Sequence, residues 1–349
     1  MMIANGICIY EPQVIFWGIA CGFHGYSIEF IDKYATCIYA KEIKQGLRYR
    51  RQLWRVGIRR YIPIVHSLKI INKFCSSLVG FVVPEIDDNE LDNFTGKKYF
   101  HLMDYYLFVT RNQYFLEKYR INYVIGHTQM DKYCDFFKLF YNEYIGKTIS
   151  LPFGYAKRFS YYNPFKERKN IAIGLGSINH INDPMLAENV KKQFVEYFKD
   201  YEYMHPLRRY IQTHESEFSD VIEARFPNPE KQKDFSYDAV SVLNEYKMFI
   251  NDAGVSNFPP ARTFEGIACG CVMVAEDNEI YTDLGFIPDV NYISFEKENY
   301  HQMHDKIKYY MEHTEKLNDI QEKSLELSKK YSHAKVAKLL YDAIINTQV

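Results

Sequence analysis

Short apolar runs alternate with amphipathic stretches along this chain, and the alternation starts a second time near residue 170. In the first part, the apolar runs predict strands and the amphipathic stretches predict helices. The predicted strands span residues 14–20, 36–40, 78–83, 106–110 and 122–125, and the predicted helices span residues 27–33, 111–119 and 131–144. Strands that alternate with helices form a parallel sheet covered on both faces. The pattern therefore predicts an α/β fold.

The second part repeats this scheme after a break. Residues 151–169 lose the pattern and are polar, aromatic and basic, which is typical of a link between domains. A strand at residues 171–175 follows, and Asp183-Pro184 supplies an N-cap and a first-turn proline for a helix that reaches about Asp200. The later elements predicted are helices at 237–246, 261–269, 300–312 and 314–345 and strands at 248–251, 272–275 and 292–294.

The length of 349 residues suits two domains better than one. We expect an amino-terminal α/β domain at residues 1–155 and a carboxy-terminal α/β domain at residues 156–327. Residues 328–349 are expected to form a terminal helix that packs back on the first domain.

Charge, cysteines and the start of the chain bear on the setting of the protein. The formal net charge is −1, which argues against a dedicated nucleic-acid binder. The seven cysteines are scattered without the spacing of a zinc site, which favours reduced thiols in the cytoplasm. The apolar run at residues 14–23 is about half of the ~20 residues that a membrane span needs, and no basic residue precedes it. We interpret it as a buried strand rather than a signal peptide.

The segment from Asn251 to Gly270 has the clearest chemistry. Pro259-Pro260 start a helix after a strand and a polar loop, and Gly270 ends it. Arg262 and Glu265 are three residues apart near the start of this helix and therefore share a face. A helix N-terminus with an added arginine suits a diphosphate, and a carboxylate one turn later can accept hydrogen bonds from ribose hydroxyl groups. An exposed ion pair between the two side chains is the alternative.

The run Arg262-Thr-Phe-Glu265-Gly-Ile-Ala-Cys-Gly270, with the apolar residues after it, resembles the carboxy-terminal signature of GT-B glycosyltransferases. In that signature an R-x-x-E-A-x-A-x-G helix precedes a hydrophobic strand. The resemblance covers residues 246–340, and its last helices are similar to those of the type called glycosyl transferases group 1. Leu151-Pro-Phe-Gly154 also resembles the strand end with which the amino-terminal domains of GT-B proteins close.

This resemblance implies a GT-B fold, in which two Rossmann-like domains with parallel sheets face each other across a cleft. It also implies a nucleotide-sugar donor, linked to UDP or GDP, in the carboxy-terminal domain. Glu265 would contact the ribose, and Arg262 would lie near the phosphates. The residues predicted to bind the donor are Gly176, Ser177, Arg208, Ser256, Asn257, Arg262, Thr263 and Glu265.

Two positions depart from the family pattern. Many retaining members carry an acidic residue eight positions before the ribose carboxylate, where this chain has Asn257. An Arg/Lys pair commonly follows the first strand of the second domain, but residues 176–180 contain neither lysine nor arginine. Arg208 or Arg209 is the hypothesised substitute, and a solvated helix face is the alternative for both. Whether the sugar is transferred with retention or inversion therefore stays open.

The chain has no pair of aspartates at positions i and i+2, the arrangement with which GT-A glycosyltransferases hold a divalent metal. Asp87-Asp88 are adjacent and lie in an acidic stretch, which we interpret as a solvated turn. A site without metal must neutralise the leaving diphosphate with a helix dipole and with arginine or lysine, and the helix of Arg262 offers both. We therefore expect a metal-independent enzyme without a cofactor.

The acceptor side is expected in the amino-terminal domain, in loops that follow strands. The loop after the fifth predicted strand is the best candidate, because His127, Gln129 and Asp131 place donors and acceptors close together. His127 and Asp131 are the predicted catalytic residues, and a histidine can act as a base near neutral pH. A structural histidine at a strand end is the alternative. His101 and His24 are lesser candidates.

Residues 41–73 carry ten basic side chains and a single acid, Glu42, with apolar residues interleaved. A basic amphipathic stretch that includes Trp54 favours contact with an anionic membrane surface and a lipid-linked acceptor. A solvated helix face and an RNA-binding patch are the alternatives, although aromatic residues for base stacking are sparse. We expect no nucleic-acid partner and a cytoplasmic protein that is peripheral at the inner face of the membrane.

Together these features predict a hexosyltransferase or related glycosyltransferase. It would move a sugar from a nucleotide-sugar to a glycan or lipid-linked acceptor during synthesis of a surface polysaccharide or related glycoconjugate. Another enzyme on the same scaffold, such as an epimerase or a phosphorylase, is one alternative. A GT-B-like protein that binds nucleotide or glycan without turnover is the other.

Overall fold

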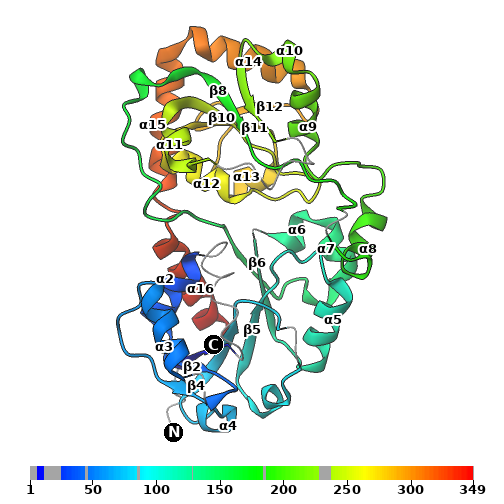
Figure 1. The fold of residues 1–349 in the computed structure, drawn as a ribbon, viewed down its shortest axis with the longest axis vertical. Helices are drawn as coiled ribbons and strands as arrows, with labels where there is room; N and C mark the ends of the chain where they lie inside the picture. Colours follow the sequence, from blue (N-terminus) through cyan, green and yellow to red (C-terminus); the bar gives the residue numbers. More distant parts are fainter. Residues whose placement is uncertain are drawn as a thin grey trace. The chain divides into compact units, whose positions relative to one another are not determined.

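The computed structural model describes residues 6–11, 25–43, 46–84, 87–127, 129–183, 186–227 and 237–348. The chain divides into two compact units, which Figure 1 shows coloured along the sequence. The amino-terminal unit comprises Met1–Phe153 together with His333–Val349, and the carboxy-terminal unit comprises Gly154–Ser332. The boundaries expected from the sequence differ slightly, at 155 against 153 and at 327 against 332.

The amino-terminal unit is built on a seven-stranded sheet in the order β3-β2-β1-β4-β5-β6-β7, and every adjacent pair is parallel. Its strands are β1 (Gly6–Tyr10), β2 (Cys37–Tyr39), β3 (Ile64–Val65), β4 (Cys75–Gly80), β5 (Lys97–His101), β6 (Tyr123–His127) and β7 (Thr148–Leu151). Its helices are α2 (Gly25–Tyr34), α3 (Gly46–Arg55), α4 (Leu68–Ile71), α5 (Val109–Lys118), α6 (Met130–Tyr133), α7 (Asp135–Phe140) and α16 (His333–Gln348), with 3-10 helices η3 (Asn89–Asn93) and η4 (Asn142–Tyr144).

Helices cover both faces of this sheet, because alternate residues of each buried strand point to opposite sides. One face packs against apolar side chains of α2, α3 and α16. The terminal helix α16 lies along α2, where the rings of Tyr34 and Tyr341 stack with centroids 4.3 Å apart (Figure 1). On the other face, the ring of Phe100 in β5 packs edge-on against Phe115 of α5 at 4.9 Å.

Two expected elements of this unit differ from the structure, and a third is not tested by it. The first strand described is β1, and the strand expected at residues 14–20 lies outside the described residues. Residues 106–110 do not form a strand, because Phe108 has a φ of 54°, which extended backbone excludes, and α5 begins at Val109. The helix expected at 131–144 is broken, because Cys134 is extended (φ −111°, ψ 105°) between α6 and α7.

The carboxy-terminal unit has a five-stranded parallel sheet in the order β12-β11-β10-β8-β9. Its strands are β8 (Lys169–Leu175), β9 (Ile222–Arg225), β10 (Tyr246–Ile250), β11 (Val272–Glu276) and β12 (Ile293–Phe295). Its helices are η5 (Phe165–Glu167), α8 (Glu188–Tyr197), α9 (Pro206–Thr213), α10 (Glu215–Phe218), α11 (Ala239–Glu245), α12 (Ala261–Ala268), α13 (Glu279–Asp283), α14 (Tyr300–Glu312) and α15 (Thr314–Ser328). The helix expected from Asp183 starts only at Glu188, with Ala187 in the N-cap position.

Strands β8 and β10 lie near the centre of this second sheet. One face is covered by apolar side chains of α9, α14 and α15. On the other face α12 packs so closely that a Cβ at Gly266 would lie 2.4 Å from the ring of Phe249 in β10. The chain passes from β8 to β9 on one side and then returns to β10 on the other. Such a reversal leaves a crevice at the carboxyl ends of the two strands, where α/β proteins bind ligands.

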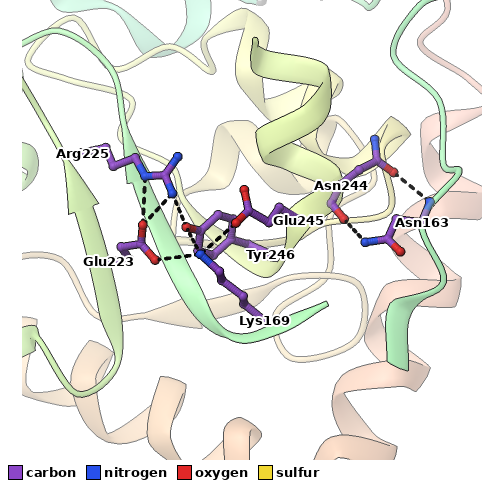
Figure 2. A network of polar contacts seen from close by, with 7 residues as sticks. All are labelled: Asn163, Lys169, Glu223, Arg225, Asn244, Glu245 and Tyr246. Atoms are coloured by element: carbon purple, nitrogen blue, oxygen red, sulfur yellow. Dashed lines mark hydrogen bonds and ion pairs between the residues drawn. The ribbon is translucent and has the colours of Figure 1, made fainter. Parts of the chain in front are cut away.

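A network of polar side chains joins β8, β9, β10 and α11 (Figure 2). Nζ of Lys169 lies 2.8 Å from a carboxylate oxygen of Glu245 and 3.0 Å from the hydroxyl of Tyr246. Arg225 donates to Glu223 and to Tyr246, each at 2.6 Å. Isolated pairs of this exposure contribute little stability, but a shared network fixes its members. The network therefore ties the edge strand β9 to the centre of the sheet.

The buried Arg168 holds the carboxyl end of α12. Its guanidinium donates to the carbonyls of Cys269 at 2.8 Å and Gly270 at 3.1 Å, and to that of Leu243 in α11 at 3.2 Å. It also donates to the side chain of Asn244, which Figure 2 shows beside Asn163. A cation at this end of a helix satisfies carbonyls that lack partners within the helix. Arg168 thereby fixes the position of α12 on the sheet.

None of the described helices is long and apolar enough to cross a membrane.

Candidate functional site

Two arginines from different helices converge on one glycine at the carboxyl end of β8. Gly176 has a φ of +118°, which residues with side chains rarely adopt. A Cβ at this position would lie 2.6 Å from Nη1 of Arg208 and 2.7 Å from Nη1 of Arg262. Arg208 belongs to α9, and Arg262 belongs to the first turn of α12. The carboxyl end of β8 thus has two guanidinium groups beside a glycine, which is an arrangement that stabilises an anion.

Arg208 is buried without a full set of hydrogen-bond partners. Its Nη1 donates to the carbonyl of Ser177 at 3.0 Å, and its Nη2 donates to the carbonyl of Asp252 at 3.5 Å. Its Nε has no acceptor among the described residues, since the carboxylate of Asp252 lies 4.0 Å away. Burial, assisted by the charge of Arg262, lowers the pKa of Arg208 to about 10 despite the opposing charge of Asp252. An anionic ligand would compensate this buried charge.

Arg262 is oriented by two neutral acceptors. Its Nη1 donates to the carbonyl of Leu175, the last residue of β8, at 2.5 Å. Its Nη2 donates to the hydroxyl of Tyr237 at 2.7 Å. Neither acceptor carries a charge, and the described structure contains no ion pair between Arg262 and Glu265. The alternative of an exposed ion pair between Arg262 and Glu265 is therefore not observed.

Glu265 is a half-buried carboxylate on the same helix. Burial raises its pKa above the ordinary value, and the nearby guanidinium groups of Arg262 and Arg158 offset part of that rise. Its carboxylate accepts no hydrogen bond from any described residue. A half-buried carboxylate without donors of its own can accept hydrogen bonds from a ligand that supplies hydroxyl groups. The position expected for a ribose-binding residue therefore has the required chemistry.

Thr263 faces the interior of the unit. Asn251, which follows β10, donates from Nδ2 to the hydroxyl oxygen of Thr263 at 2.9 Å and to that of Tyr281 at 2.8 Å. Thr263 is completely buried. The position does not support the expected contact of Thr263 with the donor, because its hydroxyl joins the start of α12 to the end of β10.

The loop between β10 and α12 contains the other expected residues, Ser256 and Asn257. The Ser256 hydroxyl is buried and has no hydrogen-bond partner within the described chain. Asn257 adopts a left-handed conformation (φ 51°), and its side-chain oxygen accepts a hydrogen bond from Asn278, the N-cap residue of α13. Asn257 is therefore held by α13, whereas Ser256 retains an unused polar group.

Asp252 and His205 also belong to this site, although no sequence motif singles them out. A carboxylate oxygen of Asp252 accepts from the backbone N–H of Gly254 at 2.7 Å, and the other lies 3.8 Å from Nδ1 of His205. Burial by itself raises the pKa of Asp252, but His205, Arg208 and the Gly254 N–H outweigh it and lower that pKa. Asp252 is thus the charge that balances Arg208. The position of Asp252 directly after a predicted strand is the sequence signal that could have identified it.

In the amino-terminal unit, the two expected catalytic residues have separate surroundings. The buried His127 ends β6, and its ring stacks on Phe153 with centroids 3.6 Å apart and lies 4.9 Å from the ring of His101. Asp131 in α6 accepts a hydrogen bond from the backbone N–H of Gly146 at 3.2 Å. His101 and His127 therefore form a pair at the carboxyl ends of β5 and β6. His24 lies outside the described residues.

Comparisons with known proteins agree with this architecture. Residues 196–342 match the family described as "Glycosyl transferase-like". Across 98% of the chain, the fold is similar to HepE of Anabaena, solved in complex with UDP, with 10% identity, a TM-score of 0.54 and 100% of that chain covered. A glycosyltransferase of Rickettsia africae is similar over 98% of both chains, with 11% identity and a TM-score of 0.52. No curated protein sequence matches the chain.

The fold is therefore of the GT-B type, with two α/β units on parallel sheets, and residues 196–342 match the glycosyl transferase-like family. The fold class expected from the sequence is confirmed by these similar structures. The expected enzyme class, a glycosyltransferase, is confirmed by the family match at residues 196–342.

Proposed function

We propose that the protein transfers a sugar from a UDP-linked donor, which binds at the carboxyl ends of β8 and β10. The convergence of Arg208 and Arg262 on Gly176 is the observation that carries this proposal. A diphosphate at that glycine would meet two guanidinium groups and the start of α12. HepE has been crystallised with UDP and with UDP-glucose, which favours UDP over GDP here.

In the proposed complex, each group has one task. Arg208 and Arg262 neutralise the charge that develops on the leaving diphosphate. Glu265, one turn after Arg262, accepts hydrogen bonds from the ribose, and Ser256 supplies a further hydroxyl. Because two arginines provide the positive charge, we propose a reaction that needs neither a metal ion nor a cofactor.

The acceptor and its activation are proposed for the amino-terminal unit. We propose His127 as the base, with Asp131 as a second polar group, because His127 ends β6 and Asp131 lies in α6, the next helix. Replacing His127 with alanine is expected to lower transfer about a hundredfold while UDP binding stays unchanged. A variant that transfers sugar at the wild-type rate would remove His127 from the reaction.

The proposed acceptor is a glycan or a lipid-linked saccharide, and the proposed role is synthesis of a surface polysaccharide. We place the protein in the cytoplasm, peripheral to the inner face of the membrane, on the basis of the basic surface at residues 41–73. A second candidate function is nucleotide binding without turnover. Asn257 favours it, because an amide replaces the acid that many retaining relatives carry there.

Calorimetry with a panel of nucleotides and nucleotide-sugars tests the proposal. We expect UDP to bind more tightly than GDP, and Glu265→Ala to weaken UDP binding about tenfold to a hundredfold. Arg209→Ala is the control and should leave UDP binding unchanged, because Arg209 follows Arg208 in the sequence but donates to Gln212, at 2.7 Å. Wild-type affinity in Glu265→Ala would contradict the ribose site. UDP binding without transfer or hydrolysis of any donor would favour the second candidate.

A further inference from the structure

Helix α3 has apolar side chains on two opposite sides. Tyr49 and Leu53 are buried against the core, as expected for a helix that covers a sheet. Leu47 and Trp54, seven residues apart, lie on the outward side and are 87% and 66% exposed. Tyr61, in the turn after the helix, is 76% exposed. Packing of the core explains the inner residues but not the outer ones, which are exposed.

The outward apolar residues are surrounded by positive charge. Between Glu42 and Glu85 the sequence contains nine lysines and arginines and no acidic residue. The guanidinium of Arg50 lies 4.0 Å over the ring of Tyr61, and that of Arg59 lies 4.4 Å over the ring of Trp54. These cation–π contacts hold cations and aromatic rings together in one surface.

The same surface is hollowed. A cavity of about 520 Å³ is lined by four arginines, four apolar or aromatic residues and no acid: Arg50, Arg51, Leu53, Trp54, Ile58, Arg59, Arg60 and Tyr61. A concave site with this lining suits a phosphate that is attached to an apolar body.

We propose that α3 and the turn to Tyr61, here called the α3 surface, dock on a leaflet of anionic phospholipid. Leu47 and Trp54 enter the headgroup layer, and the arginines pair with lipid phosphates. This inference rests on the proposed peripheral setting but not on sugar transfer. An anionic leaflet fits better than RNA. Single-stranded bases bind by stacking on aromatic rings, but Arg59 already covers one face of Trp54, and Arg50 covers one face of Tyr61.

Co-sedimentation of the full chain with vesicles tests the inference. We expect binding to vesicles of phosphatidylcholine mixed with phosphatidylglycerol, weak binding to phosphatidylcholine alone, and weakening by salt. Arg51→Gln with Arg55→Gln should reduce partition about 25-fold, since each basic residue contributes about fivefold. Leu47→Ala with Trp54→Ala keeps every charge and should reduce it about tenfold.

Matched controls change comparable residues elsewhere. Leu139→Ala removes an apolar side chain that is 60% exposed, and Lys329→Gln with Lys330→Gln removes two exposed charges; neither should alter partition. Wild-type partition in both α3 variants, equal binding to neutral vesicles, or binding of short RNA without vesicle binding would overturn the inference. UDP calorimetry on the same samples separates the two proposals, because vesicle binding without UDP binding contradicts only the proposed function.

Discussion

The guanidinium groups of Arg208 and Arg262 approach the same residue, Gly176, from two different helices. Like charges this close to a common point repel each other, and burial increases that cost. Asp252 balances Arg208 in part, while Arg262 is held by a carbonyl and a phenol. A ligand with two negative charges would relieve the repulsion, which makes the glycine the most direct target for mutation.

Gly176→Ala should remove the anion site. The new Cβ would collide with both arginines, and the φ of +118° would be strained. We expect UDP affinity to fall more than about tenfold and the free energy of unfolding to fall by about 1–3 kcal/mol. Calorimetry and urea unfolding measure the two effects. Gly146→Ala is the control, because its φ of +76° imposes similar strain but no atom lies within 4 Å. Equal UDP affinity in wild type and Gly176→Ala would place the diphosphate elsewhere.

Arg262→Gln should discriminate between phosphate and nucleoside. Loss of the charge is expected to weaken UDP binding about tenfold to a hundredfold, because charge-assisted hydrogen bonds to phosphate are stronger than hydrogen bonds between neutral groups. Uridine, which lacks the diphosphate, should bind the variant and the wild type about equally. Calorimetric titration with both ligands checks the difference, and an equal loss for the two would show that Arg262 supports the fold rather than the phosphates.

Glu265→Gln should weaken UDP binding but stabilise the folded state at neutral pH. Burial raises the pKa of Glu265 above its ordinary value of 4.5, so the folded state without ligand disfavours the carboxylate. The native state then binds more protons than the unfolded state between these two values. Stability attributable to Glu265 is therefore present below pH 4.5 and lost as the pH rises through the raised pKa.

At neutral pH we accordingly expect Glu265→Gln to unfold at a higher temperature than the wild type while binding UDP more weakly. The difference in melting temperature should shrink as the pH falls toward 4.5. Thermal unfolding from pH 4 to 8 measures it. A variant less stable than the wild type at pH 7 would mean that the carboxylate has a structural partner.

Local patterns allowed part of the site to be predicted. Arg262 and Glu265 were placed correctly on the first turns of a helix, because prolines before it and a glycine after it fix its ends. The approach of Arg208 to Gly176 was only a hypothesis, since it depends on how α9 packs beside β8. Thr263 shows the limit, because its side chain points inward and only the fold determines that.

The same limit applies to the amino-terminal unit. Adjacent acids at Asp87-Asp88 suggested a solvated turn, and for Asp87 this is correct, since it is half exposed and pairs with Lys118 at 2.7 Å. Asp88 is buried instead and accepts hydrogen bonds from Tyr10 at 3.1 Å and Tyr39 at 3.0 Å. Strands distant in the sequence supply these partners, so no local pattern could reveal them.

Asp88→Ala should destabilise the amino-terminal unit. The substitution leaves two buried tyrosine hydroxyls without their acceptor, and we expect a loss of about 2–4 kcal/mol in the free energy of unfolding. Urea unfolding followed by tryptophan fluorescence reports on this unit, because both tryptophans of the chain, Trp17 and Trp54, belong to it.

Asp87→Ala is the matched control for Asp88→Ala. It removes an adjacent carboxylate of the same charge, but Asp87 is exposed and its pair with Lys118 lies at the surface. Surface pairs contribute little stability, and the Tyr119 hydroxyl that donates to Asp87 at 3.1 Å keeps its hydrogen bond from the backbone N–H of Asp88. This variant should therefore unfold much closer to the wild-type midpoint than Asp88→Ala. Similar losses in the two variants would mean that acidic charge, rather than the hydrogen bonds to Tyr10 and Tyr39, is what this segment contributes. A larger loss for Asp88→Ala alone would establish its buried carboxylate as the anchor that holds this crossover on the sheet.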